Sequence, residues 1–224
     1  MSDAPAPLEA PTLTSGMIEV PDASAFRAAT SATDAQMADL DAFLGILGDW
    51  NQRMNLVGPS ALDQFWPRHA WDSAQLLRHA LDARTFADLG AGAGFPGLIL
   101  AILLKGTPDA HVHLVESMTK RCRFLDEVVR ALALPATVHN ARAEDLDLSV
   151  DIVTARACAP LPRLLGYAKP YLKRGATAMF LKGQDVVAEL DEATKSWKFQ
   201  SHLRSSLSNP TGHILVVEGP VRER

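Results

Sequence analysis

The sequence predicts an α/β protein with a doubly wound, mostly parallel seven-stranded sheet, a terminal antiparallel hairpin and an N-terminal helical cap. From Thr85 onward, short apolar strands alternate with longer helical segments, which is typical of a parallel sheet covered by helices on both faces. A glycine-rich segment follows the first strand and opens a helix. Only a short loop, residues 208–212, separates the last two strands, so these should pair antiparallel at the edge of the sheet.

Residues 1–33 lack the periodic apolar pattern of folded elements. They are rich in Ala, Pro, Ser and Thr and carry four acids against Arg27, a local net charge of −3. We interpret this segment as a disordered or loosely attached arm. Residues 34–224 then form the folded domain, divided into a helical cap at 34–81 and a doubly wound core at 85–224.

The cap should contain two helices. The first begins near Asp34, a plausible N-cap, and its apolar residues recur at helical spacing from Met37 to Trp50. After a polar loop, the second spans Trp66 to Leu81. In the core we expect strands at 85–89, 111–116, 136–139, 151–154, 176–181, 198–206 and 213–218, and helices at 97–104, 119–133, 161–173 and 184–197.

Length and composition favour a single-domain cytoplasmic protein. The chain has 224 residues, no apolar run close to the roughly 20 residues that span a bilayer, and no signal-peptide pattern. Its two cysteines provide neither a disulfide framework nor metal-ligand spacing, so we expect no metal. The sequence shows no heptad seam, which favours a monomer. The net charge of −4 argues against nucleic-acid binding, but a basic cluster lies on the body of the chain, at Lys120, Arg121, Arg123 and Arg130.

The glycine-rich segment runs from Asp88 to Gly97 and predicts a ligand-binding loop. Glycines let the backbone turn tightly and approach a ligand, and the helix that follows offers unpaired N–H groups. The spacing of Gly92, Gly94 and Gly97 also fits a dinucleotide-binding loop, so a nicotinamide enzyme and a purely structural turn are alternatives. Asp88, two residues before Gly90, is placed to organise the loop and face a cationic ligand. Together with the terminal hairpin, it favours S-adenosylmethionine.

Acidic residues also mark the ends of the next two strands. Glu116 ends the second strand, where a carboxylate suits a ribose diol, although nicotinamide enzymes share that feature. Glu144 and Asp145 follow the third strand, where an adenine contact would lie. Each also has a simpler interpretation, because Glu116 could be merely solvated and Glu144 could cap the helical turn after it.

Seven motifs between Leu40 and Glu218 then point to one family. They are Trp50-Asn51 with Asn55-Leu56, Arg68-His69 with Asp72-Ser73, the loop from Asp88 to Gly97, Glu116-Ser117 with Lys120-Arg121 and Arg123-Phe124-Leu125, Ala141-Arg142-Ala143-Glu144, Ala155-Arg156-Ala157, and Leu181-Lys182-Gly183. In these motifs the chain resembles the bacterial small-subunit ribosomal RNA guanine-N7 methyltransferases, the RsmG or GidB family. The resemblance implies a Rossmann-like methyltransferase sheet and S-adenosylmethionine as cofactor. It also implies 16S ribosomal RNA as partner, either naked, in the ribosomal subunit or in an assembly intermediate.

The resemblance also implies roles for individual residues. It implies cofactor contacts at Gly90, Phe95, Ala143, Glu144 and Arg156, with Glu116 at the ribose. From the loop itself we add Asp88, Gly92 and Gly94 as cofactor-binding residues. Residues on the RNA side are Arg68, His69, Lys120, Arg121, Arg123 and Lys182. Arg156, His69 and Asn55 are candidates for positioning the reactants. The segment 1–33 lies outside the shared pattern.

Guanine N7 carries an in-plane lone pair at neutral pH, so its methylation needs in-line positioning and no general base. The strongest rival chemistry uses Cys158 as a nucleophile on a pyrimidine, with Arg156 lowering the pKa of the thiol. We favour a structural Cys158, since free cysteines are among the most buried residues. His111 and His113 share a strand face and are interpreted as structural. Methylation of a small molecule or protein, and ligand binding without chemistry, stay open as rival functions.

Overall fold

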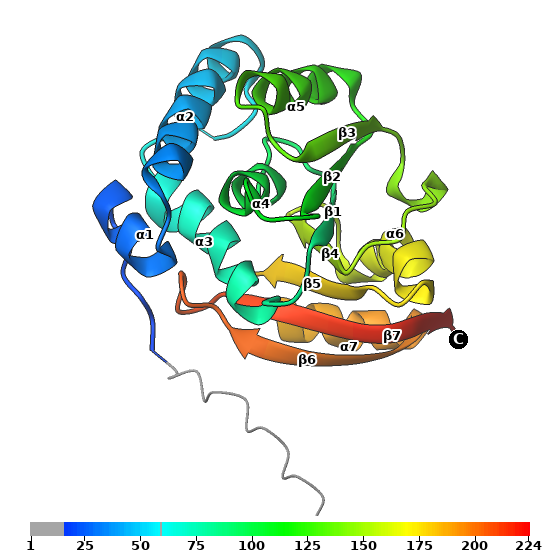
Figure 1. Cartoon of the computed structure of the whole chain (residues 1–224). Coiled ribbons are helices and arrows are strands. Elements are labelled where there is room, and N and C mark those ends of the chain that lie inside the picture. The colour runs from blue at the N-terminus through cyan, green and yellow to red at the C-terminus, as the bar shows by residue number, and fades with distance from the viewer. Residues whose placement is uncertain (1–15, 59) are drawn as a thin grey trace, which may run out of the picture.

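The predicted fold class is confirmed in the computed structural model, which describes residues 16–58 and 60–224. Seven strands form one sheet in the order β3-β2-β1-β4-β5-β7-β6 (Figure 1). The first five strands in the chain pair with one another in parallel, and β7 pairs antiparallel with both β5 and β6. The terminal hairpin therefore closes one edge of the sheet, as expected.

The strands start close to their predicted positions. They are β1 Thr85–Leu89, β2 His111–Glu116, β3 Ala136–Asn140, β4 Ile152–Arg156, β5 Thr177–Lys182, β6 Trp197–Ser205 and β7 His213–Glu223. The largest difference is β7, which continues beyond the predicted end at 218. An irregularity between Lys198 and Gln200 lets β6 keep pairing with this extension, so that Trp197 lies opposite Glu223.

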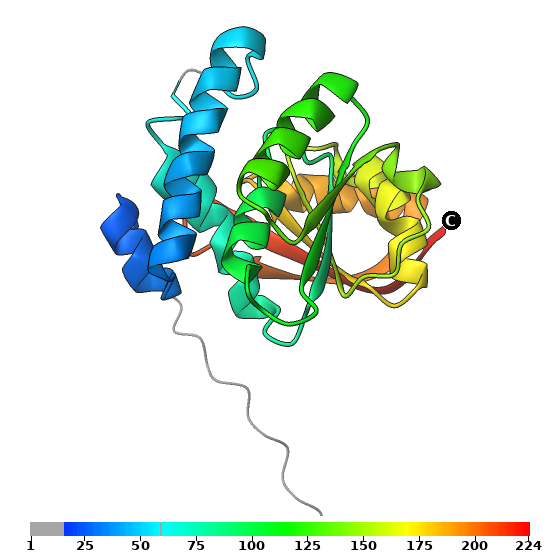
Figure 2. The ribbon, with the colours of Figure 1, turned by 45° about the horizontal axis from the view of Figure 1, so that its top comes forward.

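Helices cover both faces of the sheet. α4 Gly97–Leu104 and α5 Thr119–Ala131 lie on one face, where their buried residues join the core formed with the cap. α6 Leu161–Lys173 and α7 Val186–Ser196 lie on the other, over a second core that includes Tyr171 and Phe180. α4 reads as an unbroken apolar segment because nearly all of it is buried between the sheet and the cap (Figure 2).

The cap helices match the prediction in place but differ in detail. The N-cap of α2 Asp34–Met54 is Thr33, one residue before the predicted N-cap Asp34. The Thr33 hydroxyl accepts from Gln36 N at 3.2 Å and the Gln36 side chain accepts from Thr33 N at 2.9 Å, a reciprocal capping box. The second cap segment changes pitch along its length, through η1 Phe65–Ala70 (π-helical), α3 Trp71–Ala74 and η2 Gln75–His79 (3₁₀).

The prediction of a disordered or loosely attached arm is wrong for residues 16–33. Asp22 caps a helix, α1 Ala23–Thr30, whose Phe26 is fully buried and packs against Trp66 with ring centroids 5.4 Å apart. Val20 is buried as well. This helix is only eight residues long, too short to be stable alone, and tertiary contacts with the cap decide its structure. The part of the prediction that concerns residues 1–15 lies outside the described residues.

Within the described part of the chain, no helix combines the length and the apolar character needed to cross a membrane.

Candidate active site: two adjoining cavities

The loop from Asp88 to Gly97 turns tightly at the carboxyl end of β1. Gly90 has φ +69°, and the amides of Gly90 and Ala91 both donate to Val115 O, at 2.8 and 3.0 Å. A side chain at Gly90 would place its Cβ 2.5 Å from Cys158 Sγ. Both the backbone conformation and this close approach therefore require glycine at position 90.

Asp88 organises the loop from the protein interior. Its Oδ2 accepts from Gly97 N at 2.9 Å, its Oδ1 accepts from Thr154 Oγ1 at 3.0 Å, and its residual exposure is 1%. Burial, the largest cause, raises the pKa of this carboxyl to about 7. The expectation that Asp88 faces a cationic ligand is wrong, because the carboxyl lines neither cavity and bonds to the protein on both oxygens.

Glu116 is buried at the end of β2, which excludes the interpretation of a merely solvated acid. Its Oε2 accepts from Gly92 N at 3.1 Å and its Oε1 accepts from Met118 N at 2.8 Å. The Arg121 guanidinium lies 3.7 Å from Oε2. Each carboxylate oxygen has a second lone pair, so Glu116 can still accept from a ligand hydroxyl.

A cavity of about 240 Å³ opens beside Glu116, and we call it the smaller cavity. Ala143 and Glu144 enter it on the turn η3 Ala143–Asp145, which is fixed because Tyr171 Oη donates to Ala143 O at 2.9 Å. Its wall brings together four of the predicted cofactor residues with residues of α5, α6 and the loop after β4: Gly90, Val115, Glu116, Ser117, Met118, Arg121, Ala141, Arg142, Ala143, Glu144, Ala157, Cys158 and Tyr167.

Gly92, Gly94 and Phe95 were also predicted to contact a cofactor, but they line neither cavity. Gly92 holds the carboxylate of Glu116, and Gly94 N donates to Ala91 O at 2.7 Å to close the turn. Phe95 is buried under the cap, and its ring stacks on His69. The structure gives these three residues a supporting place in the loop.

A second cavity, of about 1130 Å³, lies between the cap and the carboxyl ends of β4 and β5, and we call it the larger cavity. Arg68, His69 and Asp72 enter it from the cap, and Arg156 and Lys182 from the sheet. Ala157 and Cys158 line both cavities. The two cavities therefore meet at the residues that directly follow β4.

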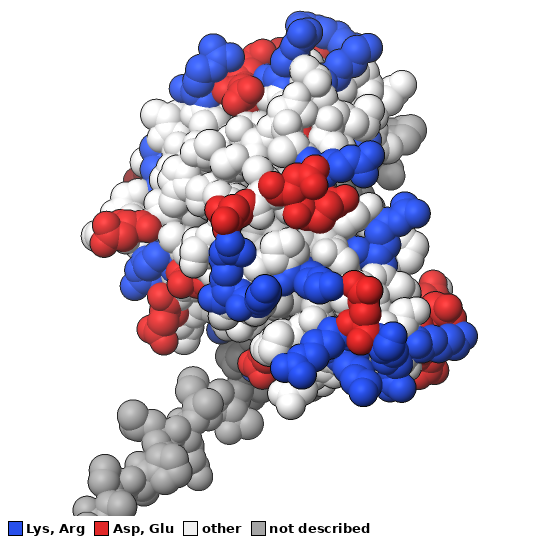
Figure 3. All heavy atoms as spheres, turned by 90° about the vertical axis from the view of Figure 1, so that its right-hand side faces the viewer, with Lys and Arg blue, Asp and Glu red and all other residues white. Residues whose placement is uncertain are grey.

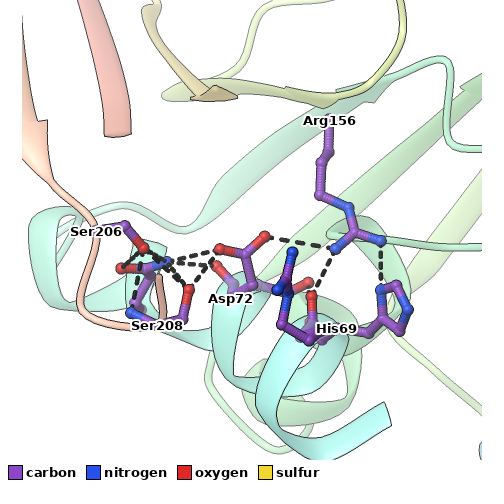
Figure 4. A network of polar contacts seen from close by, with 8 residues as sticks. His69, Asp72, Arg156, Ser206 and Ser208 are labelled. Atoms are coloured by element: carbon purple, nitrogen blue, oxygen red, sulfur yellow. Dashed lines mark hydrogen bonds and ion pairs between the residues drawn. The ribbon is translucent and has the colours of Figure 1, made fainter. Parts of the chain in front are cut away.

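Arg156 joins the sheet to the cap. One terminal nitrogen donates to Arg68 O at 2.9 Å and lies 3.4 Å from Asp72 Oδ2, and the other lies 2.6 Å from His69 Nδ1 (Figure 4). The guanidinium also lies over the Phe95 ring, 5.1 Å from its centroid. These contacts hold the Arg156 side chain between the sheet and the cap. It lines the larger cavity, beside the junction with the smaller one.

Asp72 is held in turn by a network that the sequence did not reveal. Its Oδ1 accepts from Ser208 Oγ at 2.7 Å and from Gln75 Nε2 at 3.0 Å, and the fully buried Gln75 accepts from Leu207 N at 2.7 Å. Ser206 completes the cluster (Figure 4). The β6–β7 loop is thereby tied to the cap. Asp72 belongs to the motif Arg68-His69 with Asp72-Ser73, but nothing in the sequence indicates that it bonds to Ser208, more than 130 residues away.

His69 lies in the wall of the larger cavity, as expected for a residue on the RNA side. Burial lowers the pKa of its imidazole to about 4, and the positive charges of Arg156 and Arg68 contribute to the same direction. His69 is therefore neutral at physiological pH. Arg68 itself is exposed at the cavity wall, and only its carbonyl oxygen takes part in the Arg156 contacts.

The other predicted RNA-side cations differ in their surroundings. Lys120 and Arg123 are exposed on α5, whereas Arg121 points back to Glu116 and lines the smaller cavity. Lys182 Nζ lies 2.7 Å from Glu189 Oε2 with only 9% of its side chain exposed. Lys182 thus lies in the wall of the larger cavity as an ion pair with Glu189, and its predicted place on the RNA side stays a prediction.

Asn55 is not brought to the other positioning candidates. It is the C-cap of α2 with φ +46°, its amide donates to Asn51 O at 3.2 Å, and it lines a separate small cavity with its neighbours in the chain. Asn55 therefore ends a cap helix, and its role in positioning the reactants stays a prediction.

Cys158 is a poor nucleophile in this setting. Burial raises the pKa of its thiol to about 11, and the nearby acids Asp88 and Glu116 add to the effect. Arg156, which was expected to lower this pKa, is turned toward the cap. Among the histidines, His113 Nδ1 and His139 Nε2 lie 3.0 Å apart, and no metal-binding cluster occurs within the described ranges.

Charges of both signs alternate on the side of the molecule where the C-terminus lies (Figure 3). Surface ion pairs such as Lys169–Glu223, at 2.7 Å, are part of this balance. The exposed basic residues Lys120 and Arg123 thus stand on a body with little net charge.

A family model and individual relatives place the chain in the same protein family. A family model described as rRNA small subunit methyltransferase G (GidB) matches residues 36–214. The chain is 68% identical over 198 residues to a "Ribosomal RNA small subunit methyltransferase G" of Caulobacter sp. (strain K31), covering 88% of this chain and 90% of that relative. A protein of the same name from Caulobacter vibrioides (strain NA1000 / CB15N) is 60% identical over 203 residues, covering 91% and 94%.

Among solved structures, a SAM dependent methyltransferase from Aquifex aeolicus matches with a TM-score of 0.52 at 16% identity, covering 78% of this chain and 97% of that chain. This similarity shows a shared fold.

Proposed function

Because the chain belongs to the rRNA small subunit methyltransferase G family, we propose that it binds S-adenosylmethionine at the smaller cavity and methylates N7 of a guanine in 16S ribosomal RNA held in the larger one. The observation that carries this proposal is the junction of the two cavities at Ala157 and Cys158. A donor in one cavity and an acceptor in the other would meet at this junction.

The residues of the smaller cavity fit the cofactor. Glu116 supplies buried acceptor oxygens for a ribose diol, and Gly90 contributes to the cavity wall, with Cys158 packed against it. The volume of about 240 Å³ lies below the roughly 300–1,000 Å³ of most small-molecule sites. The amino-acid end of the cofactor would therefore extend past Cys158 toward Arg156, whose guanidinium has five N–H donors and suits a carboxylate.

When bound, S-adenosylmethionine supplies an electrophilic methyl group on a sulfonium. The residues of the chain then have to hold the acceptor nitrogen in line with that group and exclude other orientations. Guanine N7 already presents a lone pair, so no side chain has to remove a proton. Consistent with this, the nearby thiol of Cys158 is protonated at neutral pH, and the imidazole of His69, with a pKa of about 4, is a weak base.

A small-molecule or protein substrate is the alternative. The larger cavity is broad and carries the exposed Arg68 in its wall, and Lys120 and Arg123 are exposed on α5. These cations favour a phosphate-bearing substrate. Because the chain as a whole is not basic, we propose that the ribosomal subunit is a better substrate than naked RNA, with ribosomal proteins supplying part of the docking surface.

The proposal is tested with purified protein and methyl-tritiated S-adenosylmethionine. Small ribosomal subunits and naked 16S RNA, both from cells that lack this gene, are offered separately, and the labelled nucleoside is identified after digestion. We expect label in N7-methylguanosine, with faster transfer to the subunit. Label in 5-methylcytidine would assign the chemistry to Cys158, and binding of the cofactor without label in either RNA would favour a small-molecule or protein substrate.

A further inference from the structure

The contact between Arg156 and His69 fixes the protonation of the histidine. Arginine side chains have N–H donors and no acceptor, so the 2.6 Å contact requires His69 Nδ1 to accept. An accepting Nδ1 carries no proton, and the neutral ring must therefore hold its proton on Nε2. The low pKa of this imidazole, about 4, agrees with a ring that stays neutral.

The orientation of the ring is fixed as well. The rings of His69 and Phe95 stack, with their centroids 4.7 Å apart and their planes at 22°. Arg156 lies over the Phe95 ring and is held there by its contacts with Arg68 O and Asp72. Asp72 is itself anchored by Ser208 and Gln75. The donor at Nε2 is thus prepositioned before any substrate arrives, which lowers the entropic cost of using it.

The Nε2 donor is available to a ligand. No hydrogen bond within residues 16–58 and 60–224 uses it, and it is absent from the set of fully buried atoms without a partner, which are Trp50 Nε1, His79 Nε2 and His213 Nδ1. Because His69 lines the larger cavity, an accessible N–H of fixed direction belongs to the wall of that cavity.

We propose that Nε2–H of His69 donates a hydrogen bond to O6 of the target guanine and thereby selects guanine and presents its N7 for methylation. This inference rests on the proposed function. Guanine carries two adjacent acceptors, N7 and O6, on one edge, whereas adenine has an amino donor in place of O6. A donor that cannot become an acceptor is satisfied by guanine and opposed by adenine. The bond to O6 leaves the lone pair of N7 free to attack.

The test combines a protein variant with a base variant. Small subunits are reconstituted with 16S RNA in which the methylated guanine is replaced by 2-aminopurine, which keeps N7 and lacks O6. Single-turnover methyl transfer is measured for the wild type, His69→Phe, which retains an aromatic ring next to Phe95, and His69→Gln, which retains an N–H donor. Binding of S-adenosylmethionine and the melting temperature of each variant confirm that the fold and the cofactor site are intact.

We expect wild-type transfer to be about 10- to 100-fold slower with 2-aminopurine than with guanine. His69→Phe should lose a similar factor with guanine and lose no more with 2-aminopurine, while His69→Gln should recover part of the rate. Independent, multiplicative losses from the two changes would overturn the inference, because they would show that His69 and O6 are not coupled. A wild type that forms no N7-methylguanosine would instead contradict the proposed function.

A second readout does not involve catalysis. Nitrogen-15 NMR of histidine-labelled protein should show His69 with an unprotonated Nδ1 and a protonated Nε2 down to about pH 5. Replacement of Arg156→Gln should allow the proton to move between the two ring nitrogens of His69 and should raise the pKa of the imidazole toward that of an ordinary histidine. A wild-type His69 that is protonated on Nδ1, or that titrates near pH 6.5, would overturn the inference.

Discussion

Cys158 lies at the junction of the two cavities, and its protonation decides between two kinds of chemistry. Cys158 is half-buried in the loop after β4, and its Sγ lies against Gly90 in the loop from Asp88 to Gly97. A thiol with a pKa of about 11 is almost entirely protonated at pH 7.5. Its place in the wall therefore supports a packing role.

Replacement of Cys158→Ser should leave methyl transfer within about threefold of the wild type, because a hydroxyl of similar shape preserves the wall and no thiolate is needed. The rate is measured with saturating cofactor at pH 7.5. Near-complete loss of activity, together with a covalent adduct between the wild type and a fluoropyrimidine-containing RNA, would contradict this prediction.

At the residue scale, the residues of the smaller cavity could be predicted from the sequence better than those that hold the larger cavity in place. Gly90, Glu116, Ala143 and Glu144 gather in the smaller cavity because they end neighbouring parallel strands, which brings them to the same edge of the sheet. The anchoring of Asp72 by the β6–β7 loop was not predictable. It depends on side-chain contacts between distant segments, which follow no local pattern.

At the scale of elements, the loop after β1 combines a strained backbone with a close packing contact. Gly90 and Gly106 both have positive φ, +69° and +87°, but only Gly90 has neighbours within reach of an added Cβ. The two positions therefore separate the cost of the backbone conformation from the effect on the cavity.

Gly90→Ala should weaken binding of S-adenosylmethionine by about tenfold or more, since the new methyl displaces Cys158 from the junction and strains the turn. Gly106→Ala is the matched control, and it should lower stability and leave the affinity unchanged. Calorimetric titration measures both. An equal loss of affinity in the two variants would show that backbone strain, and not the contact with Cys158, controls binding.

The start of α5 is the element that most favours RNA. Arg121 and Arg123 look equivalent in the sequence, but Arg121 approaches Glu116 while Arg123 is exposed. Charge reversal at Arg121 is therefore expected to disturb both the cofactor site and RNA binding. Of these two arginines, Arg123 is the one that tests RNA docking alone.

Arg123→Glu should weaken binding to 16S RNA by about tenfold at low salt, with a smaller effect as salt increases, and should leave cofactor affinity unchanged. Arg130→Glu, near the other end of the same helix, is the control and should have a smaller effect. Filter binding at several salt concentrations measures the difference. Equal losses at both positions would argue against a localised docking site at the start of α5.

Element prediction failed where local pattern was weak. α1 is only eight residues long and depends on the burial of Phe26, and the pitch changes between η1 and η2 depend on packing under the cap. The alternating core elements were predictable because buried strands and amphipathic helices leave strong periods in the sequence.

At the scale of the whole molecule, half-buried histidines make the folded state sensitive to acid. The pKa of His113 is lowered to about 4 by burial, with contributions from His111 and His139, and that of His69 is lowered similarly. Between pH 6.5 and 4 the unfolded chain binds protons that the folded chain does not, so stability falls as the pH decreases through this range. Asp88, whose pKa is raised to about 7, acts in the opposite direction, since its contribution to stability declines as pH rises from about 4 to 7.

His113→Gln should reduce the decrease in melting temperature between pH 7 and pH 5, because it removes one group whose protonation favours unfolding. His202→Gln, at an exposed position on β6, is the control and should leave the decrease close to that of the wild type. Melting curves at pH 5, 6 and 7 provide the comparison. An equal decrease in melting temperature in all three proteins would show that His113 does not cause the acid sensitivity.

The central claim is that two adjoining cavities align a methyl donor with guanine N7, and that no side chain removes a proton. The most direct test is the pH dependence of single-turnover methyl transfer to the small subunit between pH 7.5 and 9.0. We predict a nearly constant rate, because N7, His69 and Cys158 do not change protonation in this range. A rate that rises about tenfold per pH unit and loses this rise when a single side chain is replaced would identify a general base or a thiolate nucleophile and contradict the account.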